Sequence, residues 1–197
     1  MIIDHPTTGG IHILDDFIDV ETAEIIEQRL IAHPKKVLTE LTDDGVNFYS
    51  STKDDNGDEY KQPSLVIANN GQMDEFFNPI VNKIHEHIEL IWGRKVGLEN
   101  RYDFCGYQEG EMLKPHYDGL KPDLPTPAGY ESRDVSSVLY LNSGFTGGVL
   151  NFPNLGVSVS PKRGMLALFP SSQIYTHYVT PVESGVRFFM TQFWCLQ

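Results

Sequence analysis

Lys114-Pro115-His116-Tyr117-Asp118 lies just past the midpoint of a chain of 197 residues, in a region whose residue pattern predicts a β-strand. Alternate side chains of a strand point to the same face. We therefore expect His116 and Asp118 to project together and Tyr117 to point away. An imidazole nitrogen beside a carboxylate supplies two of the three protein ligands of one common type of open metal site.

His177 is the candidate third ligand. It lies 59 residues after Asp118 (177 − 118), in a second strand-like run over residues 174–179. Two histidines and one carboxylate on one face of a metal form the facial triad of non-haem Fe(II) oxygenases. The alternative is that His116 and Asp118 are ordinary polar residues of a surface loop, because such short motifs also occur by chance.

His85-Glu86-His87 provides an internal control, because its histidines have the same i, i+2 spacing as His116 and Asp118. This triplet lies in a helical pattern, where residues two apart diverge by about 200°. We therefore predict that His85 and His87 are helix-surface residues and not metal ligands.

Three further residues predict an anion pocket beside the metal. Arg187 follows His177 by ten residues (187 − 177) and is the one cation in the otherwise apolar run 185–190. An unpaired buried guanidinium is costly, and its planar fork suits a carboxylate. Tyr140 can donate a hydroxyl hydrogen bond to the same anion, and Tyr107 precedes the candidate ligands. Taken singly, Arg187 could form a salt bridge and the tyrosines could simply pack in the core.

Over residues 100–197, the order and spacing of these motifs resemble the 2-oxoglutarate- and Fe(II)-dependent dioxygenases, more narrowly their prolyl 4-hydroxylase branch. The opening Leu14-Asp15-Asp16-Phe17 is similar too, though more weakly. The motifs that carry the resemblance are Tyr107-x-x-Gly110, His116-x-Asp118, Tyr140-Leu141-Asn142, Gly147-Gly148, Gly164-x5-Pro170, His177 and Arg187.

Two positions depart from the pattern of that family. Leu113 stands three residues before the first metal histidine, where the family often has tyrosine, and this departure bears on the identity of the substrate. Arg187 stands where collagen-type members have lysine, as in the hypoxia-sensing relatives, and it is a functional equivalent.

The resemblance implies both cofactors and activity. Fe(II) would be held by His116, Asp118 and His177. The co-substrate 2-oxoglutarate would be held by Arg187 and Tyr140, with Tyr107 lining the pocket. O2 and ascorbate complete the implied set, and the implied reaction is hydroxylation of proline in a peptide or protein.

The sequence leaves three alternatives to a proline hydroxylase open. The same chemistry could act on a free amino acid, another side chain or a small metabolite. A metal-binding barrel could bind a partner without turnover. A hydrolytic zinc site would use the same three ligands, but it would leave the anion pocket unexplained.

The composition narrows the class of protein. With 40% hydrophobic and 21% charged residues, the chain predicts one folded domain over residues 1–197. A formal net charge of −12 disfavours binding to nucleic acid or to an anionic membrane, and it suits a cationic peptide or basic protein. Cys105 and Cys195 lie in apolar runs and predict buried thiols in a reducing, cytoplasmic location. We find no signal-peptide region and no apolar run long enough to span a membrane.

The periodicity predicts a mainly β fold with flanking helices. A helix over about 20–33 would begin at an Asp19 N-cap and bury Ala23, Ile26 and Leu30. A second helix would begin at Asn78-Pro79 and end at Gly93. Short strands follow from Arg101 onward. We predict a double-stranded β-helix (jelly roll) over residues 100–197, with the helices of a support region over 1–95 backing one sheet.

Two polar stretches are predicted as loops. Residues 41–63 are expected to form a solvated loop, with a mobile lid as the alternative. A calcium site at 54–59 is rejected, because Glu59 stands where an EF-hand loop needs glycine. Residues 120–134 would border the substrate entrance in the resembled family, which makes Lys121, Tyr130 and Arg133 candidate substrate contacts.

Overall fold

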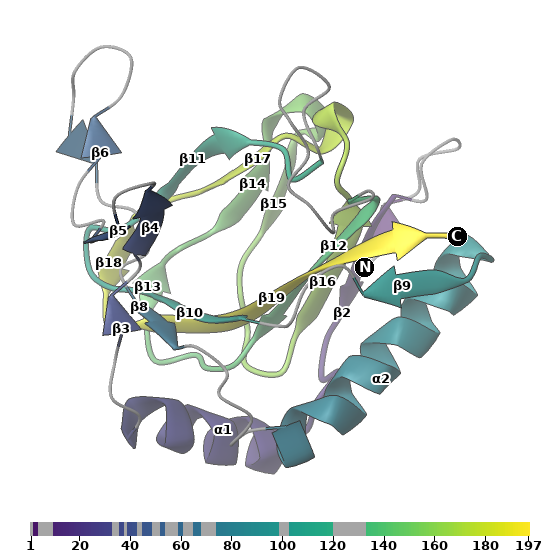
Figure 1. Cartoon of the computed structure of the whole chain (residues 1–197), viewed down its shortest axis with the longest axis horizontal. Coiled ribbons are helices and arrows are strands. Elements are labelled where there is room, and N and C mark those ends of the chain that lie inside the picture. Colours follow the sequence, from purple (N-terminus) through teal and green to yellow (C-terminus); the bar gives the residue numbers. More distant parts are fainter. Residues whose placement is uncertain are drawn as a thin grey trace.

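The computed structural model describes residues 2–3, 10–32, 36–37, 39–42, 45–48, 52–53, 59–60, 65–67, 74–98, 103–119 and 133–197. Figure 1 shows two layers of β-strands that face one another. Helices α1 (Val20–Ala32) and α2 (Asp74–Trp92) lie on the outer side of one layer. This is the predicted double-stranded β-helix with helices backing one sheet.

The larger layer is a nine-stranded sheet in the order β1-β2-β16-β12-β19-β10-β8-β3, and β9 also pairs with β19. All of its pairings are antiparallel. Its strands are β1 (Ile2–Ile3), β2 (Ile11–Leu14), β3 (Lys36–Val37), β8 (Leu65–Ile67), β9 (Val96–Leu98), β10 (Asp103–Tyr107), β12 (Val135–Tyr140), β16 (Leu166–Pro170) and β19 (Arg187–Leu196).

The smaller layer is a four-stranded sheet in the order β11-β17-β14-β15. Its strands are β11 (Leu113–His116), β14 (Leu150–Phe152), β15 (Val157–Val159) and β17 (His177–Val179). Short pairs join β13 (Thr146–Gly147) with β18 (Val182–Ser184), β4 (Thr39–Thr42) with β5 (Gly45–Phe48), and β6 (Thr52–Lys53) with β7 (Glu59–Tyr60). Two 3-10 turns complete the described elements, η1 (Pro153–Leu155) and η2 (Gln173–Tyr175).

Helix α1 begins and packs as predicted. Asp19 caps it, because its carboxylate accepts hydrogen bonds from the backbone N–H and the hydroxyl of Thr22, both at 2.8 Å. These bonds, the backbone one first, lower the pKa of the Asp19 carboxyl. Ala23, Ile26 and Leu30 are fully buried on its inner face.

Helix α2 begins earlier than the prediction at Asn78. It starts at Asp74, so Pro79 lies inside the helix, where it removes one backbone hydrogen bond. Phe77, in the additional turn, is fully buried and packs on Phe104 with ring centroids 4.3 Å apart. This aromatic burial offsets the missing bond. Gly93 follows the helix with φ +64°, as a C-terminal glycine should.

Strand β19 separates two hydrophobic cores because its side chains alternate. Phe188, Met190 and Trp194 face the helices and belong to the core between α1, α2 and the larger sheet. Phe189 belongs to the second core, between the two sheets. Its neighbours on the same face of the strand include Arg187, so the larger sheet presents a cation to the space between the layers.

Three local predictions are wrong. The polar stretch 41–63 is not a continuous loop, because strands β4 to β7 form within it; residues 54–58 lie outside the described residues. Ile174 and Tyr175 belong to η2, so the strand begins only at His177. Cys105 is buried, but Cys195 is only half-buried, and neither forms a disulfide. Neither helix of the described structure is long and apolar enough to cross a membrane.

Candidate active site

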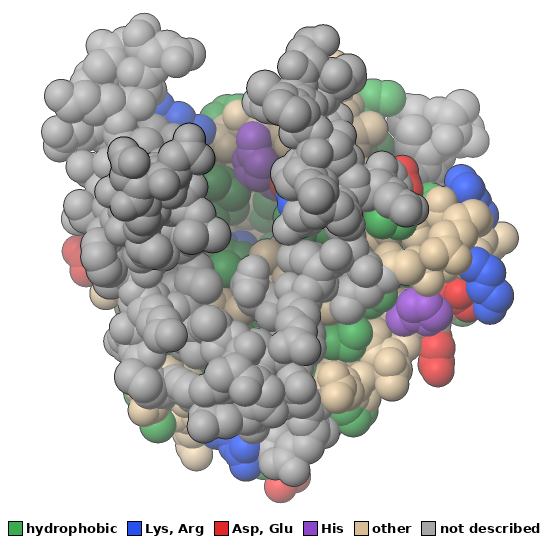
Figure 2. Space-filling view, viewed as in Figure 1, with side chains coloured by type: hydrophobic (Ala, Val, Ile, Leu, Met, Phe, Trp, Pro, Cys, Tyr) green, Lys and Arg blue, Asp and Glu red, His purple; other side chains and the backbone are tan. Residues whose placement is uncertain are grey.

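A cavity of about 190 Å³ lies between the two sheets. Figure 2 shows a hollow on this face of the molecule in which a histidine side chain lies among hydrophobic ones. The smaller sheet contributes His116, His177 and apolar residues to its lining, and the larger sheet contributes Tyr107, Tyr140 and Arg187. All six site residues predicted from the sequence, including Asp118, therefore line one cavity.

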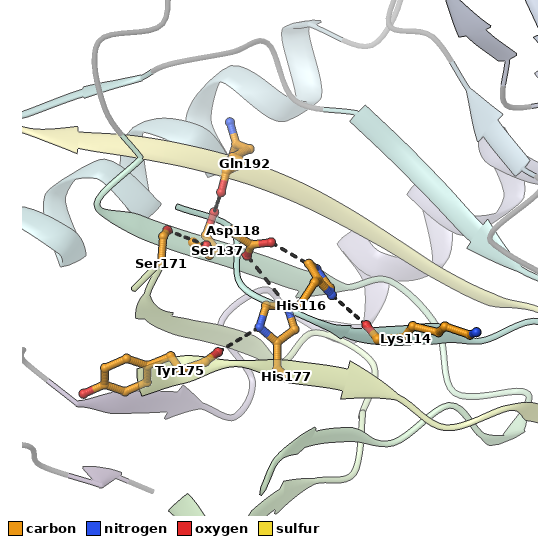
Figure 3. Close-up of polar contacts among 9 residues, drawn as sticks. Lys114, His116, Asp118, Ser137, Ser171, Tyr175, His177 and Gln192 are labelled. Atoms are coloured by element: carbon orange, nitrogen blue, oxygen red, sulfur yellow. Dashed lines mark hydrogen bonds and ion pairs between the residues drawn. The ribbon is translucent and has the colours of Figure 1, made fainter. Parts of the chain in front are cut away.

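His116, Asp118 and His177 converge on one point of this cavity, as Figure 3 shows. One ligand atom from each lies within 4.8 Å of those of the other two. The Nε2 atom of His116 is 3.2 Å from Oδ1 of Asp118, and the Nε2 atom of His177 is 3.7 Å from Oδ2. Three close ligand atoms, each from a residue type that binds iron, fit a facially bound divalent metal.

The smaller sheet positions the two histidines. His116 ends β11, His177 begins β17, and the two residues are direct partners in the antiparallel register. Asp118 lies beyond the end of β11, so strand alternation does not place it, contrary to the prediction. Its neighbour Gly119 instead donates its N–H to the carbonyl of Ser171 at 2.7 Å, which docks this segment on the end of β16.

Backbone carbonyls fix the orientation of both rings. Nδ1 of His116 lies 2.9 Å from the carbonyl oxygen of Lys114, and Nδ1 of His177 lies 3.0 Å from that of Tyr175. A carbonyl only accepts, so Nδ1 carries the proton and Nε2 presents its lone pair to the site. Burial lowers the pKa of His177 despite the opposing effect of Asp118, which favours the neutral imidazole that a metal needs.

Asp118 is ionised in these surroundings. Burial, the largest single effect, favours its neutral form, but the contacts with His116 and His177 and the hydrogen bond from Ser136 together outweigh burial and lower the pKa of the Asp118 carboxyl. The Oγ atom of Ser136 donates to Oδ2 at 2.7 Å. The site therefore presents the anionic ligand that a divalent metal requires.

Arg187 is the cation that lines the predicted anion pocket. It is only 1% exposed, and its Nε and Nη1 atoms have no hydrogen-bond partner within the protein. Within the described part of the chain it forms no ion pair, so the salt bridge weighed as its alternative role is not seen there. The hydroxyl of Tyr140, also fully buried, lacks a protein partner too. Buried donors of this kind are expected to meet an acceptor, and a carboxylate fits them.

Aromatic rings hold the guanidinium in place. The Cζ atom of Arg187 lies 5.1 Å from the ring centroid of Tyr107, 4.9 Å from that of Tyr140 and 4.8 Å from that of Phe189. Tyr107 also stacks on Phe189 with centroids 5.2 Å apart. Burial, the largest cause, raises the pKa of both tyrosines. Both phenols therefore stay protonated, and their hydroxyl groups remain available as donors.

The remaining predicted residues lie elsewhere. His85 and His87 lie on helix α2, as their helical pattern indicated, and they make hydrogen bonds to the carbonyls of Val96 and Lys83, respectively. Arg133 stacks its guanidinium over the ring of Phe193, a residue of the cavity wall, at 4.1 Å. Lys121 and Tyr130 lie outside the described residues.

Sequence reasoning missed Ser136, Ser171 and the role of Gly148. Ser136 contacts Asp118 and Ser171 contacts Ser136 through pairing between distant strands, and a lone serine in a strand carries no signal of this. Gly148 was identified from the sequence only as part of the Gly147-Gly148 motif. A Cβ atom on it would lie 2.8 Å from Cδ of Arg187, so this glycine provides the space for the anion-binding side chain.

Residues 100–195 match the family model of the 2OG-Fe(II) oxygenase superfamily. The chain is similar to prolyl 4-hydroxylase subunit alpha-1 of Bos taurus, with 28% identity over 101 residues, or 50% of this chain and 19% of that one. The corresponding Gallus gallus subunit is 28% identical over 114 residues, or 54% of this chain and 22% of that one. The chain therefore spans about a fifth of the length of these curated relatives.

Solved structures share the fold. A Pseudomonas putida prolyl-4-hydroxylase superposes with a TM-score of 0.63 and 24% identity, covering 97% of this chain and 94% of that one. A Trichoplax adhaerens prolyl hydroxylase, in complex with a peptide fragment of a hypoxia-inducible factor, superposes with a TM-score of 0.68 and 17% identity, covering 95% and 84%. The match to the 2OG-Fe(II) oxygenase superfamily thus covers just under half of the chain, residues 100–195, and includes all six candidate site residues.

Proposed function

We propose that this chain is a 2-oxoglutarate- and Fe(II)-dependent hydroxylase that acts on proline in a peptide or protein. One observation carries the proposal. A buried guanidinium, of which Nε and Nη1 have no hydrogen-bond partner among the described residues, and a buried tyrosine hydroxyl lie in the same cavity as a two-histidine, one-carboxylate cluster. A binding module or a hydrolytic zinc site would have no use for such an anion pocket.

The six residues divide into two sets by the group that each would hold. His116, Asp118 and His177 would bind Fe(II), and Arg187 with Tyr140 would bind the distal carboxylate of 2-oxoglutarate. Bound together, Fe(II) and 2-oxoglutarate activate O2 for insertion into a C–H bond, with succinate and CO2 as co-products. The protein contributes placement of the ligands, a permanent cation for the dicarboxylate and a largely apolar wall that limits water.

The curated relatives support proline as the substrate residue, because they are prolyl 4-hydroxylase subunits. The cavity agrees with an uncharged side chain, since beyond the metal and anion groups its wall is mostly apolar, with Leu113, Val138 and Phe193 among its residues. The net charge of −12 favours a cationic peptide segment around the modified residue.

A peptide panel with proline-rich and proline-free members tests the proposal. The purified protein is incubated with Fe(II), 2-oxoglutarate and O2, and each peptide is scored by mass gain of one oxygen and by succinate formed. Oxygen gain on proline peptides alone supports the full proposal. Succinate with oxygen on another residue or a small molecule would overturn the proline assignment, and iron binding without succinate would overturn the activity.

We include ascorbate among the cofactors and a reducing, cytoplasmic location in the same proposal. Ascorbate rests on the resemblance to prolyl 4-hydroxylases and is tested by its effect on repeated turnover. The location is supported by the absence of a disulfide between Cys105 and Cys195. Fractionation of cells that express the protein tests it.

A further inference from the structure

Two buried serines connect the larger sheet to Asp118. The hydroxyl of Ser136, in β12, lies 2.7 Å from Oδ2 of Asp118 and 2.7 Å from the hydroxyl of Ser171, which follows β16. Ser136 is 0% and Ser171 is 1% exposed, so neither contact competes with bulk water.

The direction of these hydrogen bonds follows from the single proton of each hydroxyl. Ser136 donates its one hydroxyl proton to Oδ2 of Asp118. Ser136 then has only lone pairs left for Ser171, which must be the donor of the second bond. The chain therefore runs from Ser171 to Ser136 to Asp118, and each donor polarises the next.

Ser171 holds the same segment a second time through its backbone. Its carbonyl accepts the N–H of Gly119 at 2.7 Å, while its own N–H donates to the carbonyl of Asp134 at 2.9 Å. A Cβ atom on residue 119 would lie 2.8 Å from that carbonyl oxygen of Ser171, so the close approach requires glycine. These bonds hold Asp118 in place although it lies outside any strand.

We propose that Ser136 and Ser171 are positioning residues that set the orientation of the metal-binding carboxylate. With Oδ2 held by Ser136, Oδ1, which lies 3.2 Å from Nε2 of His116, would be the oxygen left to bind a metal. The inference rests on the metal site proposed above. It adds that hydroxyl groups on and next to the larger sheet orient a ligand that lies just beyond the end of β11.

The test compares Ser136→Ala with Ser137→Ala. Ser137 is the matched control, because it is the next residue of β12 and is also 1% exposed. Its hydroxyl faces the other side of the sheet, where it accepts a hydrogen bond from Nε1 of Trp194 at 2.9 Å. Both variants remove one buried hydroxyl from the same strand, but only Ser136 contacts Asp118.

Metal binding is measured on the metal-free protein by titration with Co(II), without co-substrate, together with the visible Co(II) spectrum and the melting temperature. Loss of a hydrogen bond behind a metal ligand typically lowers affinity about 10- to 100-fold. We expect this loss and an altered Co(II) spectrum for Ser136→Ala, a smaller loss for Ser171→Ala, and wild-type affinity and spectrum for Ser137→Ala.

The outcomes separate this inference from the proposed function. If the wild-type protein binds no Co(II), the metal site itself fails. If the wild type binds and Ser136→Ala binds equally tightly with an unchanged spectrum, only the positioning role fails. Equal losses of affinity in Ser136→Ala and Ser137→Ala would show a general effect on the strand and would also overturn it.

Discussion

At the scale of single residues, Arg187 places a permanent positive charge in the cavity wall, where three aromatic rings surround it. A charge-assisted, two-pronged contact to a carboxylate contributes on the order of 1.5–3 kcal/mol. Arg187→Ala should therefore raise the KM for 2-oxoglutarate roughly 10- to 150-fold. Initial rates of succinate formation against 2-oxoglutarate concentration measure this change.

The control for Arg187→Ala is metal affinity without co-substrate, which should stay at the wild-type value because Arg187 is not a ligand. Arg187→Lys keeps the charge but loses the planar fork, so its KM should lie between those of the wild type and Arg187→Ala. An unchanged KM in Arg187→Ala would remove this residue from the co-substrate pocket.

Asp118→Ala and His177→Ala should each abolish turnover of 2-oxoglutarate and strongly weaken metal binding, because each removes one of three protein ligands. Succinate assays and metal titration measure the two effects. His87→Ala is the control for histidine loss as such, since His87 lies on α2 and should leave both quantities unchanged. Near-native succinate formation by either ligand variant with iron would show that the triad is wrong.

Some residues of the site could be predicted from the sequence, and others could not. Local signals identified His116, Asp118 and Arg187: a histidine stands two residues before an aspartate, and a single cation stands in an apolar strand. These signals predict that the side chains meet in the folded protein. Ser136 and Ser171 are 35 residues apart and meet only through the pairing of β12 with β16. No local pattern of hydropathy or spacing encodes such a contact.

At the scale of elements, the Gly147-Gly148 turn controls the shape of the anion pocket. Gly148 has φ +61°, and an added Cβ would meet Cδ of Arg187 at 2.8 Å. Gly148→Ala should therefore displace the guanidinium and raise the KM for 2-oxoglutarate, by roughly 10- to 100-fold if the shift approaches 1 Å. Steady-state kinetics measure this effect.

Gly156→Ala is the control that separates the effect of pocket shape on the KM from the effect of backbone strain on stability. Gly156 has a similar φ, +64°, but an added Cβ would meet nothing within 4 Å. Both variants should lose roughly 1–2 kcal/mol of stability from the left-handed backbone. Only Gly148→Ala should change the KM, and an equal KM in the two variants would contradict the role assigned to the turn.

The N-cap of α1 predicts a pH dependence of stability. Asp19 has a lowered pKa in the folded protein, mainly through the N–H of Thr22, so its capping bond stabilises the fold above about pH 4 and is lost as the carboxyl protonates. Asp19→Ala should lower the melting temperature at neutral pH. The difference from the wild type should shrink as the pH falls below 4, and a difference independent of pH would contradict the charged cap.

Sequence periodicity and local signals predicted some helix and strand boundaries correctly and missed others. Capping residues located α1 correctly, because Asp19 and Thr22 are close in sequence. The start of α2 was missed since Pro79 is a strong local stop signal that burial of Phe77 against Phe104 overrides. Strands β4 to β7 were missed because their residues are polar, and short hairpins need little apolar patterning.

At the scale of the whole molecule, the two candidate binding groups belong to different layers. The metal-binding histidines lie on β11 and β17 of the smaller sheet, whereas Arg187 and Tyr140 lie on β19 and β12 of the larger one. A dicarboxylate that contacts both the metal and Arg187 would therefore bridge the sheets. A ligand that binds only the folded state raises stability according to its concentration relative to Kd.

We therefore expect metal and 2-oxoglutarate together to raise the melting temperature by more than the sum of their separate effects. At 100 times Kd, one ligand adds about 2.7 kcal/mol, which for a chain of this size is roughly 5–11 °C. Thermal melts under anaerobic conditions with Mn(II), 2-oxoglutarate, both or neither measure the coupling. In Arg187→Ala the Mn(II) increment should persist while the 2-oxoglutarate increment shrinks at the same ligand concentration. Additive increments in the wild type would show that the two ligands bind independently, and the sheets would then not be joined through the site.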